Sequence, residues 1–245
     1  PFPAHARPVD ALILAGGLGT RLASAVPDRA KPVAEVAGHP FLAFVLDHLA
    51  RCGRVRRVIL CVGHRADTVE AALGARFGRL PIAYSHEDAP LGTGGALRHA
   101  IARFRPAAPM LAMNGDTLFT LDLARLLAFH RAHRAGATMA LARVPDASRF
   151  GTVEVRAGRV TGFAEKGRAG PGWINAGTYV LGRVAAEALA AGPPAFSLER
   201  DALPAWCADG LLAGLASRAR FLDIGVPADY ARAAALFAAR PPQRA

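Results

Sequence analysis

The sequence lacks long apolar runs and has few cysteines. No stretch resembles a membrane span, and the first ten residues, PFPAHARPVD, contain no apolar segment long enough for a signal peptide. The three cysteines, Cys52, Cys61 and Cys207, are scattered without the spacing of a metal site or a redox motif. These absences argue against a membrane protein and a disulfide-stabilised secreted domain, so we expect reduced thiols in the cytoplasm.

Lysine is also scarce, although the chain is strongly basic. Thirty Lys and Arg residues outnumber 19 Asp and Glu residues, which gives a net charge of +11. The positive charges are spread along the chain, and no basic run interleaved with aromatic residues occurs, so we expect no nucleic-acid partner. Small phosphorylated substrates suit the same excess. Lys31 and Lys166 are the two lysines, and they mark either sites that need a compact ammonium group or chance retention.

The first part of the chain, to about residue 145, alternates between strand and helix patterns. This βαβα order predicts a doubly wound, mostly parallel sheet with binding sites at the carboxyl ends of its strands. Strands are expected at 11–15, 57–62, 82–86 and 110–113, and helices between Pro40 and Gly53 and over about 66–76, 93–104 and 122–135.

From residue 137 the pattern becomes rich in strands. TVEVRAGRVTGFAE predicts a hairpin about Ala157 and Gly158, and WINAGTYVL predicts a further strand. A last strand near 219–223 leads into a helix over 227–240. No repeat or low-complexity linker divides the chain. We therefore expect a single α/β domain over residues 1–245 with a β-rich second half.

The stretch LILAGGLGTRL, residues 12–22, places three glycines and Arg21 after a buried strand. A P-loop requires Gly, four residues and then Gly-Lys-Ser/Thr, and that order is absent. A dinucleotide fingerprint requires a third glycine where Leu22 stands, and an acidic residue after the second strand, where none occurs before Asp67. The dinucleotide motif is therefore a weak match, but the glycines and the cation suit a bound anion.

LAGGLGTRL followed by PDRAKP resembles the signature of the sugar-1-phosphate nucleotidyltransferases, in which a Gly-Thr-Arg trio precedes Lys-Pro. The resemblance implies a Rossmann-like fold with nucleotide-binding residues at about 10–145 and sugar-phosphate-binding residues at about 146–226. Backbone N–H groups of the loop can hold phosphates, with Arg21 on the β and γ groups and Lys31 near the α-phosphate. The nucleotide contacts implied here are Leu14, Ala15, Gly16, Gly17, Gly19, Thr20, Arg21 and Lys31.

SHEDAPLGTGGA, residues 85–96, resembles the base-recognition loop of the same family. The resemblance implies that the backbone at Gly92 and Thr93 approaches the nucleobase; a glycine-rich helix start is the alternative. Glu87 stands where pyrimidine-using members tend to carry Gln. A carboxylate only accepts hydrogen bonds, and guanine presents two adjacent donors, so Glu87 favours GTP. Glu87 could instead be a solvated loop charge.

Two aspartates follow predicted strands. Asp116 lies in LAMNGDTLF, and Asp223 lies in RFLDIGVPADY. An isolated Asp at a strand end is commonly a cap. The family, however, holds Mg²⁺ between aspartates in these two settings, and two carboxylates with triphosphate oxygens form a hard oxygen site suited to that ion. We expect Asp116 and Asp223 to bind Mg²⁺.

The acceptor site is expected in the second half. The resemblance implies that the backbone of Gly151 in RFGTVEV approaches the sugar, that Glu165 in FAEKG accepts from sugar hydroxyls, and that Lys166 neutralises the sugar phosphate. Asn175 in INAGTYV is a further sugar contact. A hairpin turn, a surface ion pair and a strand-end Asn are the alternatives.

RLASAVPDRAKP, PLGTGGA and NGDTLF most resemble the guanylyltransferases that activate D-glycero-α-D-manno-heptose 1-phosphate. The resemblance implies that GTP and the sugar 1-phosphate give a GDP-sugar and pyrophosphate, a precursor of bacterial surface polysaccharide, with Arg21, Lys31 and Asp116 catalytic. Mannose-1-phosphate guanylyltransferase and a UTP- or dTTP-using enzyme are the alternatives within the class. A nucleotide-sensing regulatory subunit and a basic nucleic-acid-binding protein are the alternatives outside it, and a homo-oligomer stays open.

Overall fold

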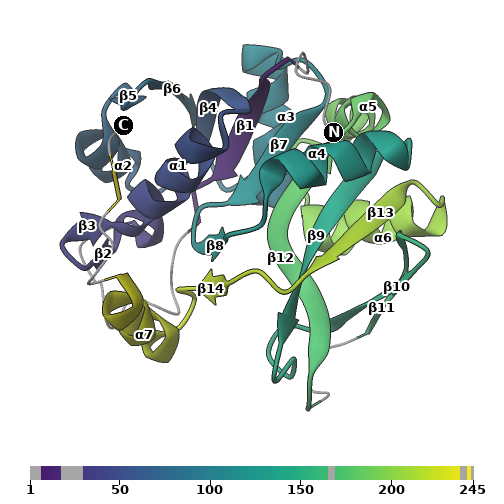
Figure 1. The fold of residues 1–245 in the computed structure, drawn as a ribbon. Helices are drawn as coiled ribbons and strands as arrows, with labels where there is room; N and C mark the ends of the chain where they lie inside the picture. The colour runs from purple at the N-terminus through teal and green to yellow at the C-terminus, as the bar shows by residue number, and fades with distance from the viewer. Residues whose placement is uncertain (1–6, 18–29, 165–168, 238–241, 244–245) are drawn as a thin grey trace.

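The computed structural model describes residues 7–17, 30–164, 169–237 and 242–243. A twisted ten-stranded sheet in the order β10-β11-β13-β9-β12-β7-β1-β4-β6-β5 runs through the molecule, with helices on both faces (Figure 1). Its strands are β1 (Val9–Leu14), β4 (Val55–Val62), β5 (Arg76–Phe77), β6 (Leu80–His86), β7 (Met110–Asn114), β9 (Ala137–Val144), β10 (Thr152–Arg156), β11 (Arg159–Ala164), β12 (Gly172–Leu181) and β13 (Leu212–Ser217).

Two small sheets accompany the large one: β2 (Glu35–Val36) with β3 (His39–Pro40), and β8 (Thr117–Phe119) with β14 (Phe221–Asp223). The helices are α1 (Phe41–Cys52), α2 (Ala66–Leu73), α3 (Gly92–Phe104), α4 (Leu123–Ala132), α5 (Arg183–Ala191), α6 (Leu203–Ala208) and α7 (Pro227–Phe237). A 3₁₀ turn, η1 (Lys31–Val33), and a π-helical turn, η2 (Leu198–Ala202), complete the described elements.

The first half of the chain confirms the predicted doubly wound arrangement. β1 pairs in parallel with β4 on one side and with β7 on the other, and β4 pairs in parallel with β6. The chain thus builds outward from β1 to β6 and then returns to place β7 on the other side of β1. A crevice forms where the strand order reverses in this way, at the carboxyl ends of the strands, and ligands bind there in such sheets.

The second half continues the same sheet through antiparallel pairs. β12 lies between β7 and β9 and is antiparallel to both. β13 then pairs in parallel with β9, and the β10–β11 hairpin closes the edge. The hairpin turns at Ala157 and Gly158, as predicted, with φ of 47° and 77°, which suits the two-residue turns that match the twist of paired strands. β12 therefore joins the two halves into one sheet.

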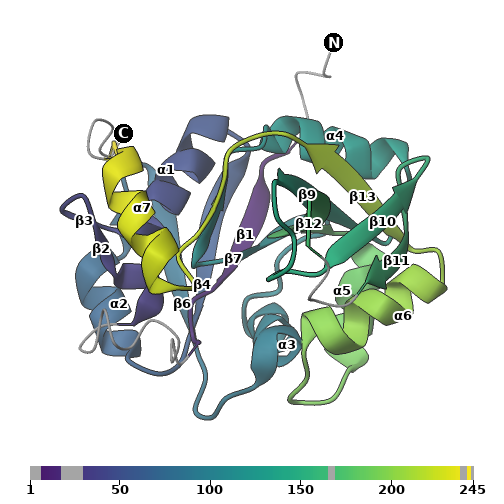
Figure 2. The ribbon, with the colours of Figure 1, turned by 90° about the horizontal axis from the view of Figure 1, so that it is seen from below.

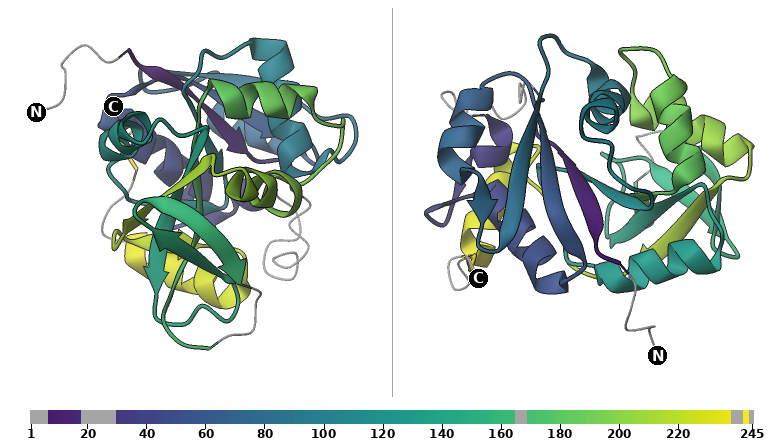
Figure 3. Two further views of the ribbon diagram at one scale, coloured as in Figure 1. Left: turned by 90° about the vertical axis from the view of Figure 1, so that its right-hand side faces the viewer. Right: turned by 90° about the horizontal axis from the view of Figure 1, so that it is seen from above.

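The sheet separates two apolar clusters. One cluster contains buried residues of α1, α4 and α7, such as Phe41, Leu126 and Phe237. The other contains buried residues of α3, α5 and α6, such as Leu97 and Trp206. Figures 2 and 3 show these two sets of helices on opposite faces of the sheet. Strands covered on both faces are expected to be continuous apolar runs, which is the pattern that the sequence shows.

The structure corrects or extends the predicted elements at three points. The strand expected near 219–223 is present as β14, but it pairs with β8 outside the large sheet. The α5, η2 and α6 elements were not predicted. The helix expected over 227–240 is described as far as Phe237, and residues 238–240 lie outside the described part. Within the described residues, no helix combines the length and apolar character needed to cross a bilayer.

Candidate active site

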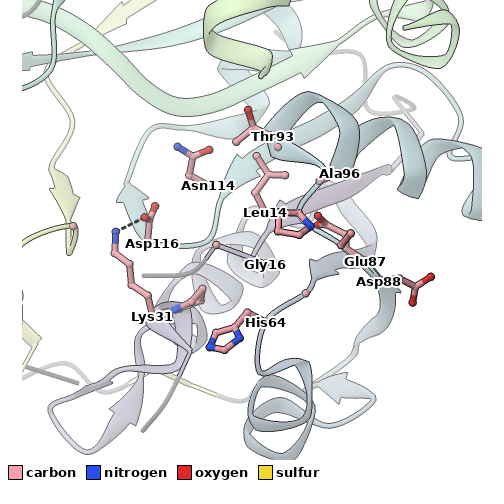
Figure 4. Close-up of a pocket in the computed structure, with 17 residues that line it drawn as sticks. Leu14, Gly16, Lys31, His64, Glu87, Asp88, Thr93, Ala96, Asn114 and Asp116 are labelled. Carbon is pink, nitrogen blue, oxygen red and sulfur yellow. Dashed lines mark hydrogen bonds and ion pairs between the residues drawn. The ribbon is translucent and has the colours of Figure 1, made fainter. Parts of the chain in front are cut away.

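A cleft of about 680 Å³ opens at the carboxyl ends of β1, β4, β6 and β7. In the view of Figure 4, Lys31 and Asp116 lie on one side of it and Glu87 lies on the other. The cleft is lined by Leu14, Gly16, Gly17, Lys31, Pro32, Gly63, His64, Glu87, Asp88, Ala89, Pro90, Gly92, Thr93, Ala96, Asn114, Asp116 and Gly225.

The predicted glycine-rich loop begins at the floor of this cleft. The Ala15 N–H donates to the Cys61 carbonyl at 2.8 Å, and its side chain is buried, so Ala15 anchors the loop without lining the cleft. A Cβ on Gly16 would lie 3.0 Å from Glu87 Oε1 and 3.1 Å from the Gly63 nitrogen. A side chain at residue 16 would therefore fit only tightly where this loop passes the loops that follow β4 and β6. Gly19, Thr20 and Arg21 lie outside the described residues.

Glu87 follows β6 as a half-buried carboxylate. The Leu91 N–H donates to its Oε2 at 3.4 Å, and among the described residues no cation forms an ion pair with it. Burial raises the pKa of Glu87, and the Leu91 hydrogen bond opposes this shift only in part. A partly desolvated carboxylate without a cation costs free energy in the empty protein, which a ligand with hydrogen-bond donors would recover.

The glycines at the start of α3 pack against a distant segment. Gly92 has φ of +71°, and a Cβ there would lie 2.5 Å from the Phe196 carbonyl oxygen. That oxygen accepts from the N–H groups of Gly94 and Gly95, at 3.0 and 3.2 Å. The glycines therefore have a packing role besides the predicted approach of Gly92 and Thr93 to a base, and that approach stays a prediction.

Lys31 and Asp116 form an ion pair inside the cleft. Lys31 begins η1, which is anchored by the buried side chains of Pro32 and Val33. Its Nζ donates to Asp116 Oδ2 at 2.5 Å, and the Lys31 side chain is only 10% exposed. Thr117 Oγ1 donates to the other carboxylate oxygen of Asp116 at 3.2 Å. The Lys31 ammonium group is thus held by Asp116 beside the cleft.

The small β8–β14 sheet brings Asp223 to the same place. Asp223 pairs with Thr117 in the antiparallel register, and the Ile224 N–H donates to the Asp116 carbonyl at 3.1 Å. Burial first, and then the negative charge of Asp116, raise the pKa of Asp223, while Lys31 lowers it. The two predicted metal ligands are therefore neighbours, although their strands are separated by about 100 residues of sequence.

These two carboxylates fit a divalent cation. Their combined charge exceeds that of Lys31, and carboxylate oxygens are the ligands that hard cations prefer. Within the described residues, no group of three or more His, Cys, Asp or Glu side chains could hold a metal by itself. The protein would thus supply two ligands, and phosphate oxygens and water would supply the others.

Of the predicted sugar-binding residues, the two that the structure describes, Gly151 and Asn175, do not line this cleft. Gly151 precedes β10. The Asn175 amide is used within β12, where its Nδ2 donates to Tyr179 Oη at 2.7 Å and its Oδ1 accepts from the Gly177 N–H at 3.0 Å. Glu165 and Lys166 lie outside the described residues.

Asn114 and His64 line the cleft and were not singled out from the sequence. Asn114 Oδ1 is buried without a hydrogen-bond partner in the described structure, and a Cβ on Gly177 would lie 2.6 Å from its Nδ2. The position of Asn114 just before the Gly-Asp pair, at the end of β7, could have identified it. His64 follows β4 in the same way, at the same edge of the sheet.

Comparison with known proteins agrees with this geometry. The model of the nucleotidyl transferase family matches residues 10–240. D-glycero-α-D-manno-heptose 1-phosphate guanylyltransferase from Aneurinibacillus thermoaerophilus is 38% identical over 92% of this chain and 96% of that protein. The enzyme of the same name from Campylobacter jejuni is 35% identical, over 91% and 97%. Mannose-1-phosphate guanylyltransferase from Mycobacterium tuberculosis is 39% identical over 93% of this chain but only 64% of its own length.

Solved structures give the same result. HddC from Yersinia pseudotuberculosis superposes with a TM-score of 0.83 and 34% identity, covering 94% of this chain and 99% of that chain. A second structure of that protein, complexed with GMP-PN, has a TM-score of 0.82 with the same identity and coverage. The family generally uses a divalent metal ion. Since the family model spans nearly the whole chain and the two heptose 1-phosphate guanylyltransferases match along nearly their full length, this protein belongs to the nucleotidyl transferase family.

Proposed function

We propose that this protein is a guanylyltransferase that converts GTP and D-glycero-α-D-manno-heptose 1-phosphate into the GDP-heptose and pyrophosphate. The observation that carries the proposal is the cleft itself, in which Glu87, a partly desolvated carboxylate with no cation partner among the described residues, lies across from the Lys31–Asp116 pair (Figure 4). This chain covers almost the whole length of the two relatives named as heptose 1-phosphate guanylyltransferases, which supports the choice of sugar.

Glu87 supplies the choice of base. A carboxylate accepts two hydrogen bonds side by side, and the ring N–H and amino group of guanine are two adjacent donors. Uracil and thymine present one donor between two acceptors, and a carboxylate oxygen facing an acceptor is repelled. Binding of guanine would also offset the cost of burying Glu87 without a cation.

The chemical step needs positioning and charge neutralisation. A phosphate oxygen of the sugar 1-phosphate attacks the α-phosphorus of GTP in line, the bond to the bridging oxygen breaks, and pyrophosphate leaves. The attacking oxygen is anionic near neutral pH, so no general base is needed. Lys31, held beside the cleft, neutralises negative charge that develops at the α-phosphate. Arg21 and Lys166 keep the roles that the family resemblance implies.

Mg²⁺ is the metal that we propose for Asp116 and Asp223. When bound by the two carboxylates, it would neutralise part of the triphosphate's negative charge and help to position the triphosphate. The proposed partners are the two phosphorylated substrates, and the proposed place of reaction is the cytoplasm, where nucleoside triphosphates are abundant.

The test crosses GTP, ATP, UTP and CTP with a panel of sugar 1-phosphates that includes the heptose and mannose compounds, and measures pyrophosphate release. We expect the highest kcat/KM for GTP with the heptose phosphate. Preference for UTP would overturn the assignment of the base to Glu87. Preference for mannose 1-phosphate would support the second candidate, mannose-1-phosphate guanylyltransferase, to which the 39% identity with the Mycobacterium enzyme points.

A further inference from the structure

A segment of the second half caps the helix that borders the nucleotide cleft. The N-terminal residue before α3 provides no side-chain hydrogen bond to the helix. Instead, the Phe196 carbonyl accepts from the N–H groups of Gly94 and Gly95, and the Phe196 N–H donates to the Leu91 carbonyl at 2.9 Å. Free N–H groups at a helix start need such partners. The start of α3 is therefore held by residues about 100 positions later in the chain.

Thr93, which lines the cleft, is fixed by the adjoining η2 turn. Its Oγ1 donates to Glu199 Oε2 at 2.5 Å and accepts from the Leu198 N–H at 2.8 Å. A hydrogen bond to an ionised carboxylate is shorter and roughly twice as strong as one between neutral groups. The Thr93 hydroxyl has thus used its donor and one acceptor site on η2, and its side chain has one defined orientation.

The same contacts extend to Glu87. Leu91 accepts from Phe196 through its carbonyl and donates to Glu87 Oε2 through its N–H. Burial first, and then the negative charge of Glu199, raise the pKa of the Tyr179 phenol. The Glu199 carboxylate and the neighbouring Phe196 thus connect the second half of the chain to the start of α3, and Leu91 extends this connection to Glu87.

We propose that Glu199 is a positioning residue for the nucleotide: by holding Thr93 from the second half of the chain, it fixes residues 87–93 at the base end of the cleft. The proposal rests on the proposed function in taking this cleft as the nucleotide site. Glu199 acts through Thr93, so its loss changes how well the nucleotide is bound rather than the chemical step.

The test compares Glu199→Ala with Glu199→Gln, which keeps an acceptor oxygen, and with the control Asp201→Ala. Asp201 accepts from the Ser197 N–H at 2.7 Å in the same η2 turn, and the hydroxyl of Thr93 is hydrogen-bonded to Glu199 and Leu198 rather than to Asp201. We expect Glu199→Ala to raise KM for GTP roughly 5- to 30-fold, which is less than the full effect of a lost charged hydrogen bond because Glu199 acts through Thr93, with kcat changed less than about threefold. Glu199→Gln should stay within about threefold of wild type in both constants.

Asp201→Ala should lower Tm and leave KM for GTP unchanged. Thr93→Val removes the same hydrogen bond from the side of α3 and should raise KM for GTP by a similar factor. This variant provides the test if Glu199→Ala does not fold. Equal increases in KM for Glu199→Ala and Asp201→Ala would show a merely structural role and overturn the proposal. So would an increase confined to KM for the sugar phosphate. If wild type prefers another nucleotide, the assignment of guanine to Glu87 fails. The ratio of each variant's KM to the wild-type KM, measured with that nucleotide, still decides the role of Glu199.

Discussion

Glu87 carries a free-energy cost in the empty protein that its ligand would remove. It is half-buried, its pKa is raised, and no cation among the described residues pairs with it. We expect Glu87 to contribute strongly to the choice of base, because hydrogen bonds to a charged group contribute more binding free energy than hydrogen bonds between neutral groups.

Glu87→Gln should therefore change the choice between GTP and UTP. The substitution replaces one acceptor by an amide N–H that faces a guanine donor, and this should cost roughly 2–4 kcal/mol in kcat/KM for GTP, or about 30- to 1,000-fold. UTP should lose less or gain, since an amide both donates and accepts. The GTP-to-UTP ratio with one sugar phosphate provides its own control, because folding defects lower both activities alike. An unchanged ratio would assign base recognition to other groups.

Asp223, which we propose as a metal ligand, carries a free-energy cost in the metal-free protein. Burial and the charge of Asp116 raise its pKa in the folded protein. A carboxyl with a raised folded pKa destabilises the fold once it is ionised, and this penalty is absent below the unfolded value near 3.8. Stability contributed by this group therefore falls as the pH rises through the folded pKa.

Asp223→Asn should raise Tm in EDTA near pH 7.5, and the gain should shrink as the pH approaches 4. The same variant should lose at least about 100-fold in kcat, because a lost metal ligand removes several kcal/mol of charge stabilisation. Mg²⁺ with GTP should raise Tm of wild type more than that of the variant. Asp146 is the control for sign, since hydrogen bonds from Ser148 lower its pKa, so Asp146→Asn should lower Tm at neutral pH. A lower Tm for Asp223→Asn in EDTA would contradict the assignment.

At the scale of elements, the start of α3 packs so closely against Phe196 that a side chain at Gly92 would clash with it. Gly92 combines φ of +71° with the near approach of the Phe196 carbonyl. Gly210 has a similar φ of +67°, but a Cβ there would meet open space. The two positions thus separate the cost of the backbone conformation from the cost of the clash.

Gly210→Ala should lower the free energy of unfolding by about 1–2 kcal/mol, the cost of left-handed backbone for a residue with a Cβ. Gly92→Ala should lose a further 1–3 kcal/mol or so through overpacking against Phe196. Urea unfolding of both variants measures the difference directly. Equal losses would mean that the Phe196 segment moves away at little cost, and that it does not hold α3 as described.

The elements differ in how far the sequence reveals them. β1 and β4 contain continuous apolar runs, at residues 11–14 and 58–62, because both faces of the sheet are covered there, and both strands were predicted. α5 was missed, since only Ala185 and Leu189 are buried on it and so short a stripe gives a weak periodic signal. Pro204 in α6 resembles a helix breaker, but it lies in the first turn, where proline is tolerated.

The site was predictable where local motifs mark it and not where distant residues meet. Asp116 and Lys31 were identified from their motifs, and the structure joins them across 85 residues. The contact between Thr93 and Glu199 spans 106 residues, and no local pattern around Glu199 points to α3. Such pairs depend on the order of strands in the sheet, which the sequence pattern leaves open.

At the scale of the whole molecule, one sheet extends through the proposed nucleotide and sugar halves, joined at β12. Whether the halves unfold together is open to measurement, because the two tryptophans lie in the second half, Trp173 on β12 and Trp206 on α6. Their fluorescence reports on that half alone.

We expect GTP to raise the urea midpoint of the tryptophan-monitored transition, although its proposed contacts lie mainly in the first half. At 100 times its Kd, a ligand that binds only the folded state adds about 2.7 kcal/mol to stability. Far-UV circular dichroism should show the same midpoint, as a single cooperative domain requires. A tryptophan transition that GTP leaves unmoved would show that the halves unfold independently and that the single-domain prediction is wrong.

The position of β13 has a consequence for synthesis of the chain. β9 pairs with β12 on one side and with β13 on the other, yet β13 ends at Ser217, more than 70 residues after the end of β9. During translation one side of β9 therefore stays without its partner until most of the polypeptide has left the ribosome. Unpaired strand edges are sites of intermolecular association. Nascent chains stalled between Leu181 and Leu212 should be the most prone to aggregate, and a chaperone that shields exposed strands should act on them.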